Sequence, residues 1–205
     1  MDYSFFYVGL GYLLGSIPFG LLLTKMSGMG DVRKIGSGNI GATNVLRTGN
    51  KGLAVATLLL DGLKGLAPVL IAGQYAPDFM AMAGAAAFLG HVFPVWLNFK
   101  GGKGVATYVG VLLALSWPSG LAAIVIWVSA LALFRYSSLS SLVAAAAAPF
   151  LVWAFETPAG ASWMDTRLSV MWVFVMGVVV FFRHRDNIRR LLAGEEPKVG
   201  RKSQK

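Results

Sequence analysis

The sequence predicts an all-α integral membrane protein, a compact bundle of about seven transmembrane helices with its N-terminus outside and its C-terminus in the cytoplasm. Of the 205 residues, 56% are hydrophobic and only 13% are charged, so most of the chain is expected to lie in lipid. The hydrophobic residues form long uncharged runs, and the lysines and arginines gather between them. These observations predict one membrane-embedded domain over residues 1–205.

The apolar runs define the spans, because a bilayer core about 30 Å thick needs roughly 20 helical residues. The first run follows Asp2 rather than a basic segment, which favours a retained anchor over a cleaved signal peptide. A basic cytoplasmic tail, residues 183–205, follows the last run. The expected spans are residues 5–24, 53–72, 79–97, 105–117, 120–134, 139–155 and 168–182.

The fourth and fifth spans are separated only by Trp117 to Gly120, a Pro-containing stretch that suits either a tight extracellular turn or a kink in one long helix. Charge favours the turn. With seven spans, every lysine and arginine except Lys64 and Arg167 falls in a cytoplasmic segment. A single span over residues 105–134 would instead put the basic tail outside, against the positive-inside rule.

The composition also excludes several function classes. Without cysteine the chain has no disulfide framework and no thiolate, and two histidines with nine acids predict neither a metal cluster nor a cofactor. The net charge of +9 fits a membrane surface better than nucleic acid, because the aromatic residues are not interleaved with the basic ones. Helices rich in glycine and alanine predict close packing in lipid.

The first cytoplasmic loop contains a glycine-rich segment, Gly36 to Arg47. It matches G-x-G-x-x-G, but membrane spans flank it instead of a βαβ unit, so a dinucleotide site is excluded. Glycines permit positive φ and let backbone N–H groups approach an anion, which predicts an anion cradle; the alternative is a flexible loop with an interfacial arginine. The expected members of the cradle are Gly36, Ser37, Gly38, Asn39, Gly41, Ala42, Thr43, Asn44 and Arg47.

A second glycine-rich loop, Lys100 to Thr107, precedes the fourth span. It lacks Walker A spacing, yet backbone donors, a helix N-terminus and an ammonium together predict a phosphate site. We expect Lys103 to be the ligand and Gly101, Gly102 and Gly104 to supply backbone donors. Lys100 is expected to reach the lipid headgroups.

A third polar segment, Arg183 to Leu191, continues the last span. In a helix, His184 and Asn187 share a face that suits an active site, whereas Arg185 and Arg189 share another that suits anionic lipid. A purely structural His184 is the alternative.

Further polar residues lie within or beside the spans. Asp61 and Lys64 are expected to form an ion pair and are also candidates for framing a cavity. For His91, a hydrogen bond to a carbonyl freed by Pro94 competes with a catalytic role. Serines open the sixth span, where Ser138 and Ser141 are candidate phosphate contacts or helix caps.

Together these segments resemble the bacterial acyl-phosphate-dependent glycerol-3-phosphate acyltransferases of the inner membrane. The resemblance covers nearly the whole chain, from Gly36 to Arg47, through Asp61 to Gly65 and His91 to Thr107, to Arg183 to Glu196. One departure is Ile40, where the family usually has proline.

The resemblance implies transfer of an acyl group from acyl-phosphate to the 1-hydroxyl of sn-glycerol 3-phosphate, which gives lysophosphatidic acid and phosphate in the first step of phospholipid synthesis. It implies a soluble partner enzyme that makes the acyl-phosphate. It makes Ser37 and Arg47 essential, Lys103 a glycerol-phosphate ligand, His184 and Asn187 necessary for activity, and Glu196 structural.

The residues are compatible with this chemistry, because an activated acyl-phosphate needs no covalent intermediate and the chain offers no obvious Ser-His-Asp triad. Two alternatives from other classes are a transporter for an anionic phosphorylated metabolite and a lipid-binding scaffold. A transporter needs polar groups reachable from both sides, which are scarce near the outer face.

Overall fold

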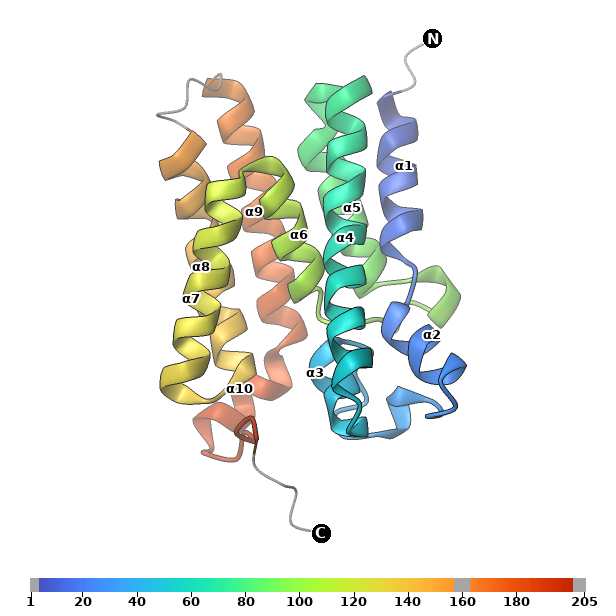
Figure 1. Ribbon diagram of the computed structural model, residues 1–205. Helices are drawn as coiled ribbons and strands as arrows, with labels where there is room; N and C mark the ends of the chain where they lie inside the picture. Colours follow the sequence, from blue (N-terminus) through green and yellow to red (C-terminus); the bar gives the residue numbers. More distant parts are fainter. Residues whose placement is uncertain (1–3, 157–162, 201–205) are drawn as a thin grey trace.

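The structure is a computed structural model that describes residues 4–156 and 163–200. Within these ranges the elements are α-helices and short 3-10 turns, with no strand, as predicted. Figure 1 shows a helical bundle in which α1 begins at one end and α10 lies at the other. Six segments are long and apolar enough to cross a membrane, and Val105–Leu115 is a shorter apolar helix. The end of the predicted tail, residues 201–205, lies outside the described residues.

The first predicted span, residues 5–24, is not one helix. α1 (Ser4–Gly15) ends before Pro18, and α2 (Phe19–Met26) begins after it. The physical reason is that proline has no N–H for a helical hydrogen bond. At the break, the Ile17 N–H donates to the Leu14 carbonyl at 3.3 Å instead of continuing the α-helical pattern.

The second span is one long helix, α4 (Lys51–Tyr75), but the third and fourth are short. α5 (Met80–Val92) has 13 residues and α6 (Val105–Leu115) has 11, which correspond to about 20 and 16 Å. Both fall below the bilayer core of about 30 Å. The predicted span over residues 79–97 corresponds to the candidate span Pro77–Leu97, but it is not one continuous helix, because α5 ends at Val92 and a 3-10 turn follows at Val95–Leu97. Figure 1 shows the connecting segment, residues 93–104, at a level between the two ends of α4.

The remaining helices are α7 (Trp117–Phe134), α8 (Ser137–Glu156), α9 (Trp163–Arg183) and α10 (Arg185–Leu192). Ser116 is the non-helical residue between α6 and α7, with φ −151° and ψ 94°, and Pro118 lies in the first turn of α7. In Figure 1, α6 and α7 lie side by side and run in opposite directions. The expected tight turn, rather than a kink in one long helix, is confirmed.

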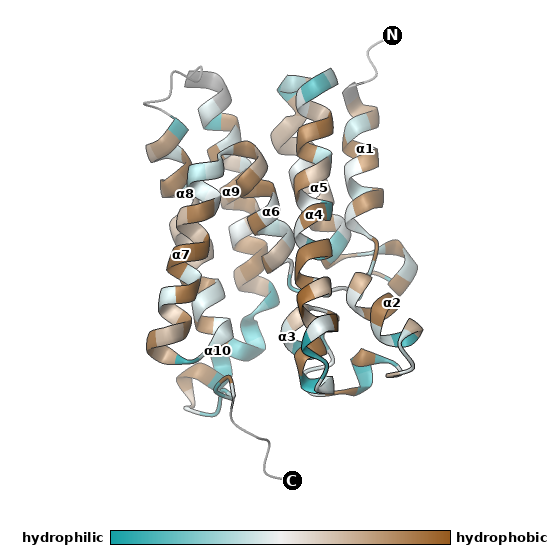
Figure 2. Ribbon diagram, in the orientation of Figure 1, coloured by the Kyte–Doolittle hydropathy of each residue, from teal (hydrophilic) through white to brown (hydrophobic). Residues whose placement is uncertain are grey.

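Small residues bring the helices into close contact, as the composition predicted. A Cβ on Gly15 of α1 would overlap the Ala87 carbonyl of α5, and one on Gly110 of α6 would overlap the Gly62 carbonyl of α4. Figure 2 shows hydrophobic flanks on the helices and hydrophilic residues around α3 and α10. This polar end of the bundle carries the candidate site.

Candidate functional site

The first loop is shaped by the side chain of Asn44, which lies in the short helix α3 (Ala42–Val45) and is buried. Its amide nitrogen donates to the carbonyls of Val32, Ile35 and Asn39 at 2.8 to 2.9 Å. Its oxygen accepts from the Ser37 N–H at 3.1 Å and faces the Ser37 hydroxyl at 3.3 Å. Asn44 therefore fixes the shape of the loop and has no donor left for a ligand.

Gly36 and Arg47 lie together on the open side of this loop. Gly36 has φ +56°, and a Cβ there would lie 2.6 Å from both Arg47 Nη1 and Asn44 Oδ1. The Gly36 N–H and the Arg47 guanidinium have no partner among the described residues. Ser37 and Arg47 are both exposed. Donors and a cation are thus free to meet an anion here, whereas the Gly38 N–H closes a turn onto the Ile35 carbonyl.

The second loop uses its glycines differently. The N–H groups of Gly101 and Gly102 donate to the carbonyls of Val92 and His91, each at 3.1 Å. These two amides are therefore occupied, which corrects the expectation that they contact phosphate. The hydrogen bonds instead satisfy carbonyls left open where α5 ends.

These glycines are needed because other groups lie directly against them. A Cβ on Gly102 would overlap the His91 ring, and one on Gly104, which has φ +79°, would overlap the Phe88 ring. The loop is thus pressed against α5, and the close fit holds the start of α6.

Arg183, the last residue of α9, holds the same loop from the opposite side. Its Nη2 donates to the Gly101 carbonyl at 3.0 Å and its Nε to the Gly102 carbonyl at 3.3 Å. The guanidinium lies 5.8 Å from the centre of the Phe93 ring. These contacts tie the Lys103 segment to the junction between α9 and α10.

His184 forms that junction and is almost fully buried. The sequence suggested that one helix continues through His184. The structure instead ends α9 at Arg183 and makes His184 the N-cap of α10, with φ −99° and ψ 8°. Its Nδ1 donates to the Val180 carbonyl at 2.8 Å, which leaves Nε2 as an acceptor. Burial and the neighbouring Lys103 lower the pKa of His184 to about 4, so the ring is neutral at physiological pH.

Lys103 and Asn187 meet directly: the ammonium donates to Asn187 Oδ1. Asn187 in turn donates to Glu196 Oε1 at 2.6 Å, and Arg190 donates to Glu196 Oε2 at 2.7 Å. Burial raises the pKa of Glu196, but its hydrogen bonds from Ser138, Asn187 and Arg190 outweigh burial and lower it overall. Glu196 is therefore an ionised anchor, in agreement with the structural role that the resemblance implied.

The pKa of Lys103 depends on charged residues from all three segments. Burial lowers its pKa to about 8; Glu196 opposes that shift, and Arg190, Arg183 and Arg47 add to it. The first loop reaches this group through Thr43, whose hydroxyl lies 3.5 Å from that of Ser137, the neighbour of the Ser138 that donates to Glu196. Among the described residues, neither Arg47 nor Lys103 forms a salt bridge with a carboxylate, whereas Arg190 is paired with Glu196.

The two candidate serines of α8 differ in their surroundings. Ser138 donates to Glu196 at 2.6 Å and so lies at the edge of the site. Ser141 donates to the Ser137 carbonyl at 2.8 Å and accepts from Trp127 at 3.1 Å, so it lies between α7 and α8. The structure gives Ser141 no route to a phosphate. Thr43 lies 3.5 Å from the Ser137 hydroxyl and joins the first loop to α8.

The polar residues within the spans gather behind the second loop. Lys64 lies 2.8 Å from Asp61, which confirms the predicted ion pair. His91 Nδ1 lies 3.6 Å from Asp61 and has no hydrogen bond to a backbone carbonyl among the described residues. The expected hydrogen bond from His91 to a carbonyl freed by Pro94 is therefore wrong.

Sequence reasoning missed Arg183 and Arg190 as parts of the site. The sequence pattern assigned Arg185 and Arg189 to anionic lipid and gave Arg183 and Arg190 no role. A signal was available for Arg190, because Gly194 is followed by two acids, and a turn at that glycine can bring one of them back to the arginine, as it does for Glu196. No sequence signal pairs Arg183 with two backbone carbonyls 81 and 82 residues away.

Comparison with known proteins agrees with this geometry. A family described as glycerol-3-phosphate acyltransferase matches residues 5–194. The chain is 62% identical to a glycerol-3-phosphate acyltransferase of Mesorhizobium japonicum, over 94% of both chains. It is 54% identical to one of Brucella anthropi, over 94% of this chain and 91% of that one.

Two solved structures have the same fold. They are crystal structures of PlsY, an integral membrane glycerol 3-phosphate acyltransferase, in a glycerol 3-phosphate form and a lysophosphatidic acid form. The TM-scores are 0.87 and 0.85 at 40% and 39% identity, and the matches cover 97% of this chain and 96% of each of those.

Proposed function

This chain belongs to the glycerol-3-phosphate acyltransferase family, and from that premise we propose that it transfers a fatty acyl group from acyl-phosphate to the 1-hydroxyl of sn-glycerol 3-phosphate. The products are lysophosphatidic acid and inorganic phosphate. The chain is a multi-pass integral membrane protein. The reaction would begin phospholipid synthesis.

One observation carries the proposal: two polar loops and the α9–α10 junction converge around Lys103. Arg47 has no partner among the described residues, Lys103 lies beside Asn187, and His184 presents a neutral acceptor. Two anionic phosphates must be held together for the reaction, and their repulsion requires fixed cations nearby. A site with two cations from different loops meets that requirement.

The chemistry is a direct acyl transfer. The hydroxyl oxygen of glycerol phosphate attacks the acyl carbonyl carbon and forms the new ester bond, the bond from that carbon to the phosphate oxygen breaks, and phosphate leaves with the electron pair. The departing phosphate accepts the hydroxyl proton, so no covalent enzyme intermediate is needed. Lys103 and Arg47 offset the negative charge on the phosphates during the transfer.

His184 is assigned a positioning role for the acceptor hydroxyl. Its Nδ1 hydrogen bond to Val180 fixes the tautomer, and Nε2 can then accept from the hydroxyl. A pKa of about 4 gives the ring little driving force to remove an alcohol proton near pH 7. Positioning is therefore favoured over general-base catalysis.

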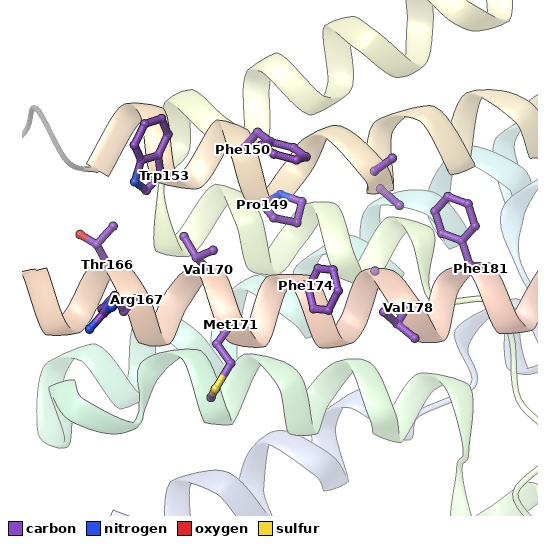
Figure 3. A pocket seen from close by; sticks show the side chains of 13 residues that line it. Pro149, Phe150, Trp153, Thr166, Arg167, Val170, Met171, Phe174, Val178 and Phe181 are labelled. Atoms are coloured by element: carbon purple, nitrogen blue, oxygen red, sulfur yellow. The ribbon is translucent and has the colours of Figure 1, made fainter.

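The acyl chain is assigned to an apolar groove between α8 and α9, shown in Figure 3. The groove has a volume of about 930 Å³ and is lined by Pro149, Phe150, Trp153, Val170, Phe174 and Phe181, among others. A smaller groove of about 380 Å³, lined by Leu142, Ile188 and Leu191, shares Ala146 and Phe181 with it. Because Ile188 follows Asn187, the two grooves lead from the polar site along the outer face of α8 and α9.

The polar end of the bundle is assigned to the cytoplasmic face of the bacterial inner membrane. The positive-inside rule supports this orientation, because the first loop and α10, which lie at the same end of the bundle, are both rich in basic residues. The N-terminus would then lie outside. A soluble enzyme that makes acyl-phosphate would deliver the donor from the same side.

The function is tested with purified protein in detergent, acyl-phosphate and labelled glycerol 3-phosphate. We expect labelled lysophosphatidic acid and one equivalent of phosphate, and no product when acyl-CoA replaces acyl-phosphate. Equal turnover with acyl-CoA would place the protein in another acyltransferase class. Binding of glycerol 3-phosphate without any product would favour the transporter or scaffold alternatives.

The groove assignment has a separate test, Ala146→Trp, where the two grooves meet at an exposed position. We expect a higher KM for acyl-phosphate and an unchanged KM for glycerol 3-phosphate. Val125→Trp, on an exposed face of α7, is the matched control. Equal donor KM values for the two variants would rule out this path for the chain.

A further inference from the structure

Behind the second loop, three ionisable side chains lie buried inside the bundle: Asp61, Lys64 and His91, which are 3%, 5% and 4% exposed. Charged groups in lipid are costly and need a reason to be kept. Asp61 lies close to both Lys64 and His91, so the three form a single polar cluster, which we call the buried triad. None of them contacts the site residues Ser37, Arg47 or Asn187 through a hydrogen bond in the described part of the chain.

On one side, the buried triad supports the first loop through α2. Lys64 donates to the Ile17 carbonyl at 2.6 Å, at the break between α1 and α2, and its ammonium lies 5.5 Å from the centre of the Phe19 ring. α2 then packs on the first loop, because Gly20 lies directly against the Ile40 carbonyl. Lys64 therefore fixes where α2 and the loop begin.

On the other side, the triad supports the second loop through His91. The His91 ring lies against the Cα of Gly102, and the His91 carbonyl accepts from the Gly102 N–H at 3.1 Å. Gly102 is the residue before Lys103. Asp61 joins the two sides, since its Oδ1 lies 2.8 Å from Lys64 Nζ and 3.6 Å from His91 Nδ1.

The contacts within the triad are held by charge more than by directed hydrogen bonds. Asp61 Oδ1 and His91 Nδ1 each lack a hydrogen bond of good geometry among the described residues, although both have an oppositely polar neighbour close by. Stability alone does not explain such a cluster, because replacing a buried ion pair with apolar residues of similar size is often neutral or stabilising. A transport pathway does not explain it either, since the charges are enclosed and paired.

We infer that Asp61, Lys64 and His91 are positioning residues that set the first loop, with Ser37 and Arg47, at a fixed separation from Lys103. The inference rests on the proposed function. It adds the three residues that align the two anion-binding loops with each other. A displacement of about 1 Å between reacting groups can cost a hundredfold in rate. The triad thus acts on the reaction through geometry, without touching substrate.

The principal test is the double variant Asp61→Leu/Lys64→Met, which replaces the ion pair with apolar side chains of similar size. We expect its unfolding temperature in detergent to stay near that of the unaltered protein, while kcat/KM for glycerol 3-phosphate falls about a hundredfold. Ser119→Ala is the matched control. It removes a buried hydroxyl contact of 2.8 Å with Ser116 at the opposite end of α6 and should keep full activity.

A second variant, His91→Ala, keeps the ion pair and removes only the ring against Gly102. We expect a loss of about tenfold in kcat/KM, because one of several supports of the second loop is lost. Wild-type kcat/KM in the folded double variant would overturn the inference. If the double variant does not fold, wild-type kcat/KM in His91→Ala would overturn it equally.

Calorimetric titration with glycerol 3-phosphate separates this inference from the proposed function. An unaltered protein that makes no lysophosphatidic acid would defeat the proposed function by itself. Weaker binding of glycerol 3-phosphate to the double variant than to Ser119→Ala would still support alignment by the triad. Equal binding and equal turnover would contradict it.

Discussion

The two glycine-rich loops look alike in the sequence, but glycine is needed in each of them for a different physical reason. In the first loop, Gly36 has a positive φ, an N–H with no partner in the described part of the chain, and an arginine side chain against it. In the second, Gly101 and Gly102 have their N–H groups bonded to α5 and their Cα atoms pressed against His91 and the carbonyl groups around it. A glycine motif can therefore mark a ligand-facing backbone or a tightly packed support.

The same comparison assigns the charges. Arg47 is presented by a loop that an internal asparagine holds in shape, whereas Lys103 is presented by a loop that α5 and Arg183 hold from two sides. The first loop exposes its cation and the second half-buries it, which lowers the pKa of Lys103 to about 8.

The largest expected effect is the loss of the half-buried cation. Lys103→Met should lower kcat/KM about a thousandfold, because it removes a fixed positive charge from a site of low dielectric. Lys100→Met is the matched control, since Lys100 is exposed on the same loop and should change activity less than twofold. Comparable losses in both variants would mean that only the overall charge of the loop matters.

The next effect separates packing from ligand contact. Gly102→Ala should destabilise the fold by about 1–3 kcal/mol, because its methyl group overlaps the His91 ring. Gly28→Ala has a positive φ but open space around it, so it is expected to cost only about 1 kcal/mol of strain. Unfolding temperatures in detergent measure the difference; equal values would contradict tight packing of the second loop.

Gly36→Ala should act mainly on binding. The new methyl group would displace Arg47, so KM for glycerol 3-phosphate or for acyl-phosphate is expected to rise about tenfold, corresponding to roughly 1.4 kcal/mol. The stability of this variant should match that of Gly28→Ala. A Gly36→Ala protein that loses stability but keeps both KM values would make the first loop a support as well.

The pH dependence tests the state of His184. Its pKa of about 4 lies below the unperturbed value of about 6.5, so the folded protein disfavours the protonated ring. Stability from this group is present above the unfolded pKa and is lost as pH falls from about 6.5 toward 4. If His184 positions the acceptor, His184→Gln should keep the shape of the rate profile near pH 6.5 and lower the rate less than a hundredfold.

Much of the fold follows from the sequence because lipid requires long apolar helices. The turn at Trp117-Pro118 and the basic loops together indicate an odd number of spans. Interruptions of the helices within the spans were harder to predict. Pro18 ends α1 early, and α5 ends at Val92 although apolar residues continue to Leu97. In both places the freed carbonyl groups are satisfied by distant partners, Lys64 and the second loop, which local sequence does not reveal.

The candidate site shows the same division. Residue types and the family resemblance point to Lys103, His184 and Asn187, and the structure brings these three together. The internal role of Asn44 and the clamp by Arg183 depend on hydrogen bonds to particular backbone carbonyls. Such bonds follow from the folded path of the chain and have no compositional signature.

The most direct measurement of the central claim, that the two loops form one site, is the alkaline limb of kcat/KM for glycerol 3-phosphate. Activity should fall as pH rises through about 8, because Lys103 loses its proton, and Arg47 contributes to that low pKa. Arg47→Met should therefore move the limb to higher pH in whatever activity remains, while Arg189→Met, at an exposed position on α10, should leave it in place. A limb that stays unmoved in Arg47→Met, or moves equally in both variants, would contradict a shared site.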